Sequence, residues 1–341
     1  MATQASLYQD RDVAVIGAGV VGLACATELV ARGARVVVYE RGPRIGAEAC
    51  SWYAGGMLAP WCEGESAEEP VIRLGQGAAD WWEHHAGCVV RQGTLVVAPS
   101  RDRSELTRFG RRTSHFDEVD GQGIAALEPD LAERFSRGLF FSGEAHLDPR
   151  QAIAALAERL VASGASIHFD SAVEPADLAA DVVLDCRGLA ARDVLPDLRG
   201  VKGEMLLLKS DEISLSRPVR LLHPRIPLYI VPRADGLFMV GATMIESGDR
   251  RRISARSMLE LLGAAYALHP AFGEAEIVEI GTDARPAFPD NLPRLLRRGR
   301  VLHVNGLYRH GFLLSPAMAR MAADAVLNPQ LRSEMLHDLA A

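Results

Sequence analysis

One glycine-rich turn constrains this chain more than any other feature. The segment Gly17-Ala18-Gly19-Val20-Val21-Gly22 joins an apolar stretch, residues 12–16, to a run with apolar residues at helical spacing, residues 20–32. Gly33 then ends the helical pattern, and a second apolar stretch follows at residues 35–39. Strand, glycine-rich turn, helix and strand in this order are typical of a doubly wound α/β unit. The sequence therefore predicts a parallel sheet with packed helices at the start of the chain.

Each glycine of this turn has a role in binding a dinucleotide. Gly17 permits the tight turn, Gly19 lets the backbone approach a pyrophosphate, and Gly22 lets the helix pack close to the strand. The start of the helix offers unpaired N–H groups and a positive dipole end to the phosphates. Glu40 ends the second strand, where its carboxylate can accept hydrogen bonds from the adenosine ribose. The turn therefore predicts a site for the ADP half of a dinucleotide and leaves FAD and NAD both open.

Regular elements are predicted along most of the remaining chain. Strands are expected at residues 94–98, 166–169, 181–186, 204–208, 228–232, 237–240, 277–282 and 301–304, with a hairpin turn at 232–236. Helices are expected at residues 149–163 and 254–268, and a last helix opens at Ser315-Pro316 and ends near Leu327. Residues 42–69 fit no regular element. These α/β units bracket a β-rich section, which predicts two domains with a chain that crosses between them more than once.

Composition limits the class of protein. A net charge of -7 over 341 residues argues against a general nucleic-acid binder, and no apolar run reaches membrane-spanning length. The stretch before Asp12 lacks the apolar core of a signal peptide. The five cysteines are odd in number and form no C-x-x-C pair, which argues against a disulfide framework and a zinc site. We therefore expect a cytoplasmic protein without metal, nucleic-acid or membrane partners; a homo-oligomer stays open.

Several further segments carry a resemblance to a known family. They are Ala54-Gly55-Gly56-Met57-Leu58, residues 185–191, residues 199–204, residues 229–233, residues 240–243, Ala284-Arg285-Pro286 and residues 306–311. With the glycine turn and Glu40, these segments resemble the D-amino-acid oxidase superfamily of FAD-dependent amine oxidoreductases, and within it the glycine oxidases of thiamine biosynthesis. The resemblance spans nearly the whole chain.

The resemblance implies a fold of the D-amino-acid oxidase and glutathione-reductase type. A Rossmann-like FAD-binding domain would comprise residues 10–85, 140–200 and 281–330. A mainly antiparallel β-sheet substrate domain would comprise residues 86–139 and 201–280, so that the two domains are interleaved along the chain.

The resemblance also implies where FAD contacts the chain. Gly55-Gly56-Met57 would pass along the flavin ring, and glycine suits that close approach. Val173 would contact the adenine side, and the segment from Cys186 to Gly188 the middle of the cofactor. Gly311 and Leu313 would lie near the flavin pyrimidine edge, where the helix dipole would stabilise the anionic reduced flavin. The other implied cofactor-binding residues are Arg41, Ser51, Arg309, His310 and Phe312. No cysteine follows Cys186, so no counterpart of a C-terminal cysteinyl flavin link exists, and FAD is expected to be non-covalent.

The substrate side calls for a cation that pairs with a carboxylate. A planar guanidinium pairs two oxygens at once, and the resemblance implies this role for Arg285, directly before Pro286. Tyr229 and Arg309 are further catalytic candidates, although Tyr229 could equally be a core aromatic. His310 could act as a base, but a lone histidine is more often structural. Asn291 departs from the family, which commonly has glycine at that point of the turn.

The implied reaction is oxidation of glycine or another small amine or D-amino acid. The products would be the imine or keto acid, ammonia and hydrogen peroxide, with molecular oxygen as the electron acceptor. No acid–base residue is demanded, because the cofactor carries the hard chemistry. The glycine imine could feed thiazole synthesis. A D-amino-acid or sarcosine oxidase, a dehydrogenase with another acceptor, and a non-catalytic FAD-binding protein remain alternatives.

Overall fold

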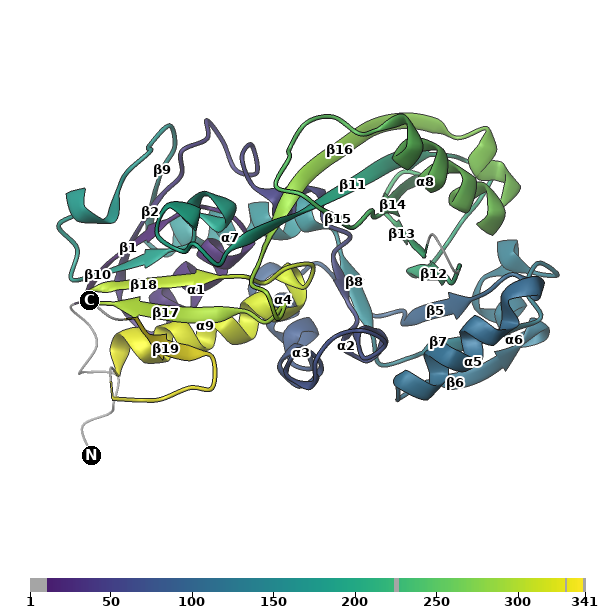
Figure 1. Cartoon of the computed structure of the whole chain (residues 1–341), viewed down its shortest axis with the longest axis horizontal. Helices are drawn as coiled ribbons and strands as arrows, with labels where there is room; N and C mark the ends of the chain where they lie inside the picture. Colours follow the sequence, from purple (N-terminus) through teal and green to yellow (C-terminus); the bar gives the residue numbers. More distant parts are fainter. Residues whose placement is uncertain (1–10, 224–226, 329, 340–341) are drawn as a thin grey trace.

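Two large β-sheets lie side by side along the long axis of the molecule (Figure 1). The computed structural model describes residues 11–223, 227–328 and 330–339. The helices are α1 Val20–Ala31, α2 Pro60–Glu63, α3 Glu69–Gly75, α4 Ala78–Ala86, α5 Arg103–Arg112, α6 Gly121–Leu127, α7 Pro149–Ala162, α8 Ala255–Leu268 and α9 Gly311–Leu327. The strands are β1 Asp12–Ile16, β2 Arg35–Tyr39, β3 Met57–Leu58, β4 Val89–Val90, β5 Thr94–Val97, β6 Asp117–Asp120, β7 Arg137–Phe141, β8 Ala145–Leu147, β9 Ser166–His168, β10 Val182–Asp185, β11 Arg199–Lys209, β12 Val219–Leu221, β13 Leu228–Pro232, β14 Leu237–Gly241, β15 Ile245–Glu246, β16 Glu276–Ala287, β17 Arg294–Arg298, β18 Val301–Asn305 and β19 Leu336–Asp338.

The first sheet has seven strands in the order β19-β17-β18-β10-β1-β2-β9. β1 pairs in parallel with both β2 and β10, which confirms the predicted strand–helix–strand start of the chain. Val13 and Val15 of β1 pack into the core that α1, α7 and α9 share, whereas Ala14 and Ile16 face a smaller core on the other side. Both faces are covered, which explains why the strand reads as one continuous apolar run.

The second sheet has nine strands, mostly antiparallel, and its core lies under α6 and α8. Its longest ladder joins β11 to β16, from Arg199 opposite Ala287 to Lys209 opposite Glu276, with a register shift between Leu207 and Leu208. This ladder corrects the prediction that a strand ends at residue 282, because pairing with β11 continues the strand through Arg285. Pro286 is tolerated there because β16 is an edge strand: among the described strands it pairs with β11 alone, apart from an isolated bridge between Ala287 and Leu307. The domain boundaries given above stay a prediction.

The last helix begins earlier than the sequence predicts. The prediction opened it at Ser315-Pro316, whereas α9 begins at Gly311 and carries Pro316 in its interior. A proline there offers no N–H to the carbonyl four residues before it, which is that of Phe312. The indole Nε1 of buried Trp82 donates to this carbonyl instead, at 2.8 Å. A tertiary hydrogen bond therefore replaces the missing helical one.

Other differences lie in short elements. Residues 42–69, predicted to be irregular, contain a 3-10 helix at Cys50–Tyr53 and the elements β3 and α2, with α3 beginning at Glu69. The sequence prediction also missed β6, β7, β8, β12, β17 and β19. These strands are short, and β6 is mostly acidic, so pairing with neighbours rather than local pattern defines them. The hairpin turn between β13 and β14 is confirmed, with Asp235 and Gly236 both at positive φ.

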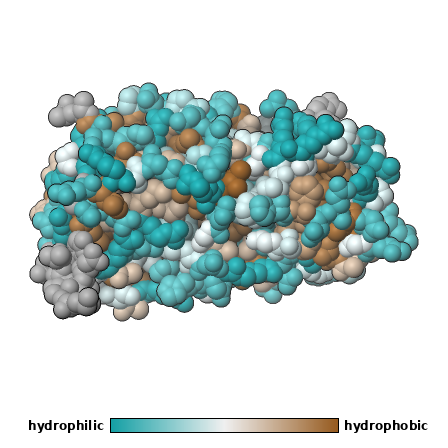
Figure 2. All heavy atoms as spheres, turned by 90° about the horizontal axis from the view of Figure 1, so that it is seen from below, coloured by the Kyte–Doolittle hydropathy of each residue, from teal (hydrophilic) through white to brown (hydrophobic). Residues whose placement is uncertain are grey.

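Hydrophilic side chains cover most of the face seen in Figure 2, and apolar side chains appear there in scattered groups. Among the residues that the structure describes, no helix is long and apolar enough to cross a membrane. The stretch before Asp12, on which the prediction about a signal peptide rests, lies largely outside the described residues.

The replacement of the helical hydrogen bond at Pro316 predicts a double-mutant result. Trp82→Phe should lower the free energy of unfolding by about 1–3 kcal/mol, because it leaves the buried Phe312 carbonyl unpaired. The same change in a Pro316→Ala background should cost less, because the introduced alanine supplies the missing backbone N–H. Urea titration of the four proteins measures both costs. Equal losses in the two backgrounds would contradict this account of Pro316.

Candidate functional site

One cavity of about 630 Å³ is lined by residues from both large sheets. Most of the predicted site residues line it, namely Gly17, Gly19, Val20, Val21, Glu40, Arg41, Ser51, Gly55, Gly56, Met57, Val173, Cys186, Gly188, Tyr229, Arg285, Arg309, His310, Gly311, Phe312 and Leu313. Ala18 and Gly22 do not line the cavity. The fold thus brings together residues that lie up to about 300 positions apart in the chain, which no local pattern could have shown.

The glycine turn is packed so tightly that side chains are excluded from two of its positions. Gly17 adopts φ +100°, and a Cβ on it would lie 2.7 Å from the carbonyl oxygen of Cys186. A Cβ on Gly22 would lie 1.9 Å from the carbonyl oxygen of Gly17. Gly22 does not line the cavity, and its role is therefore to let α1 pack closely against β1.

Two helix N-termini meet at the cavity. α1 begins beside Gly19, and α9 begins at Gly311, where a Cβ would lie 3.4 Å from a methyl group of Val20. The backbone amides of Gly19, Val21 and Gly311 find no hydrogen-bond acceptor within the described part of the chain. Unpaired amides and positive dipole ends favour anionic groups, so both helix starts suit a phosphate or an anionic ring.

Glu40 ties the glycine turn to the end of β2. Its Oε2 accepts the amide of Ala18 at 2.7 Å, and its Oε1 accepts the amide of Gly42 at 2.9 Å. The residue is only 6% exposed, yet it lines the cavity. Each carboxylate oxygen has a second lone pair, so Glu40 can accept ribose hydroxyls while it keeps these two amides.

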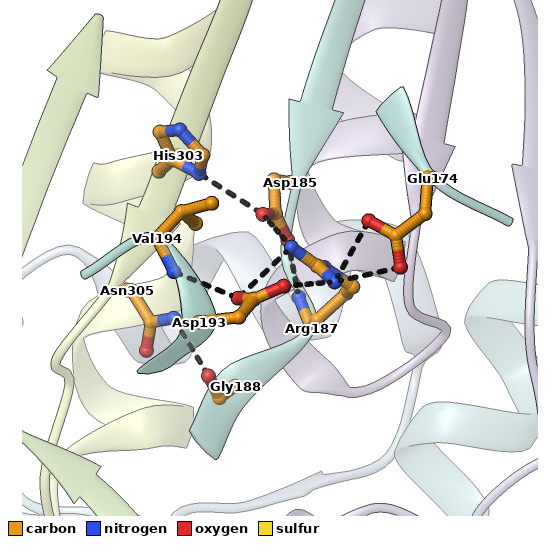
Figure 3. Close-up of polar contacts among 8 residues, drawn as sticks. All are labelled: Glu174, Asp185, Arg187, Gly188, Asp193, Val194, His303 and Asn305. Carbon is orange, nitrogen blue, oxygen red and sulfur yellow. Dashed lines mark hydrogen bonds and ion pairs between the residues drawn. The ribbon is translucent and has the colours of Figure 1, made fainter. Parts of the chain in front are cut away.

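A polar cluster around Arg187 fixes the segment that follows β10 (Figure 3). Arg187 makes a two-pronged contact with Asp185, at 3.0 Å from Nε to Oδ1 and 3.0 Å from Nη2 to Oδ2, and it also pairs with Asp193 and Glu174. His303 Nδ1 lies 3.0 Å from the same Asp185 carboxylate. The cluster is a structural support for Gly188, which lies at the cavity just after Arg187.

The Gly55-Gly56 segment is held against the second sheet. Arg233 Nη2 donates to the carbonyl of Gly55 at 2.8 Å, and a Cβ on Gly55 would lie 2.7 Å from the ring of Tyr229. Gly56 adopts φ +71°, where a Cβ would lie 2.2 Å from the carbonyl oxygen of Leu147. Burial lowers the pKa of Arg233 to about 10, so its guanidinium stays charged at neutral pH. The bare backbone of this segment therefore forms a fixed wall of the cavity.

Arg285 presents a guanidinium that no carboxylate neutralises. Its Nη1 donates to the carbonyl of Thr243 at 3.2 Å, and among the described residues it forms no ion pair. The nearby carboxylate of Asp283 is already bound by Arg250, at 2.5 Å to Oδ1 and 3.0 Å to Oδ2. A cation without a counter-ion at a cavity wall is suited to bind an anionic ligand.

Arg309, the other predicted cation, is already engaged. Its Nη2 lies 2.8 Å from Oε2 of Glu63. The same oxygen lies 3.5 Å from Nδ1 of His310, and the other carboxylate oxygen of Glu63 accepts a hydrogen bond from Arg220. Burial opposes the charge of Glu63, but Arg309 and Arg220 outweigh it and hold the pKa of Glu63 well below its ordinary value. Glu63 and Arg220 line the cavity and were missed from the sequence. Glu63 falls in a stretch with no regular pattern, and Arg220 lies on the short β12, so neither gave a signal.

His310 is the N-cap residue of α9, and its side chain makes no capping hydrogen bond. It is buried, and that burial lowers the pKa of His310 to about 4, despite the opposing influence of Glu63. A histidine with that pKa carries no charge at neutral pH.

The cysteines at the cavity are thiols. Burial is the largest cause that raises the pKa of Cys50 to about 12, and Cys186 is buried beside the glycine turn with its pKa raised well above the ordinary value, mainly by Cys25 and burial. Thiols with raised pKa values are poor nucleophiles and poor metal ligands. In the described ranges, no group of three or more His, Cys, Asp or Glu residues could hold a metal ion.

Asn291 explains the departure from the family's turn. It adopts φ +60°, a backbone conformation that glycine reaches freely and asparagine better than most other residues. Its amide donates to the carbonyl of Phe288 at 3.0 Å, and its Oδ1 accepts from Arg199. The turn therefore keeps a left-handed residue without glycine.

A mostly parallel sheet that presents two helix N-termini to a cavity, with an antiparallel sheet on the other side, suits a dinucleotide cofactor. The family model described as FAD dependent oxidoreductase (DAO) matches residues 12–325. The chain belongs to this family, and it is an FAD-dependent enzyme. The predicted fold class and the predicted cofactor FAD are confirmed.

Known relatives and structures agree over nearly the whole chain. A Rhizobium etli protein provisionally named thiamine biosynthesis oxidoreductase ThiO is 59% identical over 323 residues, which are 94% of this chain and 98% of that one. A glycine oxidase of Geobacillus kaustophilus is 30% identical over 373 residues, covering 96% of this chain and 95% of that one. The crystal structure of glycine oxidase from Geobacillus kaustophilus matches with a TM-score of 0.80, over 96% of both chains at 26% identity.

The Arg187 cluster predicts how stability depends on pH. Burial alone would raise the pKa of Asp185, but hydrogen bonds from His303 and Arg187 outweigh it and lower the pKa to about 2, from 3.8. A lowered pKa stabilises the folded state above pH 4, and this stabilisation is lost as the pH falls toward 2. Asp185→Asn should therefore lower the free energy of unfolding by about 2 kcal/mol at pH 7, and by much less near pH 2.

Asp193→Asn is the matched control, because Asp193 pairs with the same Arg187 but its side chain is 47% exposed. It should lower the free energy of unfolding by less than about 1 kcal/mol. Denaturant titrations from pH 7 to pH 2.5 measure both variants. An Asp185→Asn deficit that stays constant over this range would contradict the assigned pKa.

Proposed function

We propose that this FAD-dependent amine oxidase deaminates glycine, and other small amines and D-amino acids, in thiamine biosynthesis. The overall reaction would convert glycine, oxygen and water into glyoxylate, ammonia and hydrogen peroxide. The observation that carries this proposal is the uncompensated guanidinium of Arg285, which lines the same cavity as the glycine turn. The names of the relatives add the choice of glycine and the pathway.

The residues of the cavity fit both ends of FAD. The amides of Gly19 and Val21 would hold the pyrophosphate, and Glu40 the adenosine ribose, while Val173 and Gly188 line the cavity on that side. The bare backbone of Gly55-Gly56 and the start of α9 suit the flat flavin ring. When bound, FAD would supply the redox chemistry of the reaction, namely hydride uptake from the substrate and electron transfer to the acceptor. Non-covalent attachment of FAD stays a prediction. It is supported by the raised pKa values of Cys50 and Cys186, which make these cavity thiols poor nucleophiles.

The chain's own residues would bind and orient the substrate. Arg285 would pair with the substrate carboxylate through two hydrogen bonds, which leaves the amine and the α-carbon to point into the cavity. Tyr229, on the wall formed with Gly55, would limit where the α-carbon can lie. His310 is neutral at physiological pH, so it would add no charge beside the substrate ammonium group.

Arg309 has a different part in this proposal. Glu63 neutralises it, so Arg309 would shape the cavity rather than bind the carboxylate. A possible homo-oligomer, a cytoplasmic location and the absence of nucleic-acid or membrane partners stay predictions.

The two cavity arginines give a direct test of substrate binding. Arg285→Met should raise the KM for glycine on the order of 100-fold, because it removes charge-assisted hydrogen bonds, while FAD remains bound. Arg309→Met is the matched control and should change the KM much less, since Glu63 keeps Arg220 as a partner. Steady-state kinetics with glycine measures both. A KM that depends on Arg309 and not on Arg285 would overturn the carboxylate assignment.

The electron acceptor is tested on the wild-type protein. Glycine should reduce the bound FAD anaerobically, and oxygen should reoxidise it fast enough to support turnover, with one peroxide formed per glyoxylate. Stopped-flow absorbance with product assays follows each half-reaction. Slow reoxidation by oxygen would point to a dehydrogenase, and a preference for sarcosine or a larger D-amino acid in the same assay would replace glycine as the substrate. An FAD-loaded protein that no amine reduces would be a non-catalytic binder.

A further inference from the structure

A buried ion pair lies on β11, on the side of the strand that faces away from the cavity. Lys202 Nζ is 3.3 Å from Oε1 of Glu204, and Glu204 is 0% exposed. Gly203, between them, points the other way and lines the cavity, as strand alternation requires. Burying two charges costs desolvation free energy that their mutual attraction and hydrogen bonds must offset, and the reaction proposed above leaves this pair unused.

Glu204 holds Thr243 by three hydrogen bonds. The Thr243 hydroxyl donates to Oε2 of Glu204 at 3.1 Å and accepts the Glu204 amide at 2.9 Å. The amide of Thr243 donates to the Glu204 carbonyl at 3.2 Å. Oε1 of Glu204 is taken by Lys202 and by the amide of Ser254 at 3.3 Å. The segment that leaves β14 after Gly241 is therefore fixed at Thr243 by a single residue.

Thr243 in turn orients the cation of the cavity. Its carbonyl accepts Nη1 of Arg285 at 3.2 Å, the only hydrogen bond that the guanidinium donates to a described residue. The guanidinium lies over Gly203, where a Cβ would come within 2.2 Å of Nη2. β11 and β16 run side by side here, with Val201 opposite Arg285 (Figure 1). The contact chain from Glu204 through Thr243 to Arg285 thus passes from the back of the sheet to the cavity.

We propose that Glu204 is a positioning residue that acts through Thr243 to fix the guanidinium of Arg285 for a substrate carboxylate. The inference rests on the proposed function, because it assigns the carboxylate to Arg285. A free arginine side chain has many rotamers, and holding it in one orientation lowers the entropy lost when a ligand binds. Lys202 holds the Glu204 carboxylate in place at 3.3 Å, which gives the buried pair a role in this contact chain.

The proposal predicts a defect confined to carboxylate binding. Thr243→Val keeps the shape and the carbonyl of residue 243 but loses the hydroxyl that reaches Glu204. It should weaken binding of glycolate, a small carboxylate probe, on the order of 10-fold, with a similar rise in the KM for glycine and little change in kcat. Thr243→Ser retains the hydroxyl and should bind glycolate within about 2-fold of wild type. Titration of the bound-FAD absorbance with glycolate gives each dissociation constant without turnover.

A double-mutant cycle separates positioning from a merely structural effect. In an Arg285→Met background, Thr243→Val should cause no further loss of glycolate affinity, because its effect passes through Arg285. Bound FAD per chain verifies that each variant folds. Should Thr243→Val fail to fold, Glu204→Gln, which keeps the size but removes the charge, takes its place in the same cycle.

Three outcomes oppose the account in distinguishable ways. If Arg285→Met loses glycolate binding while Thr243→Val keeps the wild-type affinity, the positioning role is overturned and the proposed function stands. If Thr243→Val weakens binding equally with and without Arg285, its effect is structural and the inference also fails. If the FAD-loaded wild type binds no glycolate and does not oxidise glycine, the proposed function fails first.

Discussion

The cavity depends on how closely α1 approaches the end of β1. No methyl group fits between the helix and the strand at Gly22. Gly22 lies so near the Gly17 carbonyl that any side chain would push the helix away from the strand. Were the helix displaced, the amides of Gly19 and Val21 would no longer point at one place, and Glu40 could not reach the amide of Ala18. The nucleotide end of the site therefore depends on backbone packing rather than on reactive side chains.

The substrate end depends instead on how charges are distributed. The cavity contains several arginines, and most of them have a carboxylate partner: Arg250 has Asp283, and Arg309 has Glu63. Arg285 has no carboxylate partner among the residues that the structure describes, and it is held by a neutral carbonyl. Neutralising the neighbours keeps the cavity from attracting anions at several points, so one guanidinium can define the place of a carboxylate.

The sequence predicted the features that local pattern controls. The strand–helix–strand start and the hairpin at Asp235 and Gly236 were found where expected. Most of the residues predicted for the site line one cavity, and their roles there stay predictions. The resemblance to a family supplied the residues that lie far apart, since periodicity alone cannot bring Glu40 and Gly311 together. FAD was a prediction that the family match then confirmed.

The failures have tertiary causes. Pro316 was predicted to start a helix because proline is favoured in the first helical turn and rare in helix interiors. Inside α9, the distant Trp82 compensates for the missing helical hydrogen bond. Arg285 was expected at the end of a strand near residues 277–282, and the strand runs further because pairing with β11, rather than local composition, extends β16 to Ala287. Glu63 carried no signal, because its importance comes from two arginines and a histidine that the fold assembles around it.

The central claim is that FAD and the substrate carboxylate occupy one cavity, with the pyrophosphate at the start of α1 and the carboxylate at Arg285. A crystal structure of the FAD-loaded protein with glycolate would show the positions of both the pyrophosphate and the carboxylate. The account predicts density for the pyrophosphate beside the amides of Gly19 and Val21, and glycolate oxygens within hydrogen-bond distance of both terminal nitrogens of Arg285. Glycolate bound at Arg309, or a flavin that leaves the start of α1 unoccupied, would contradict it.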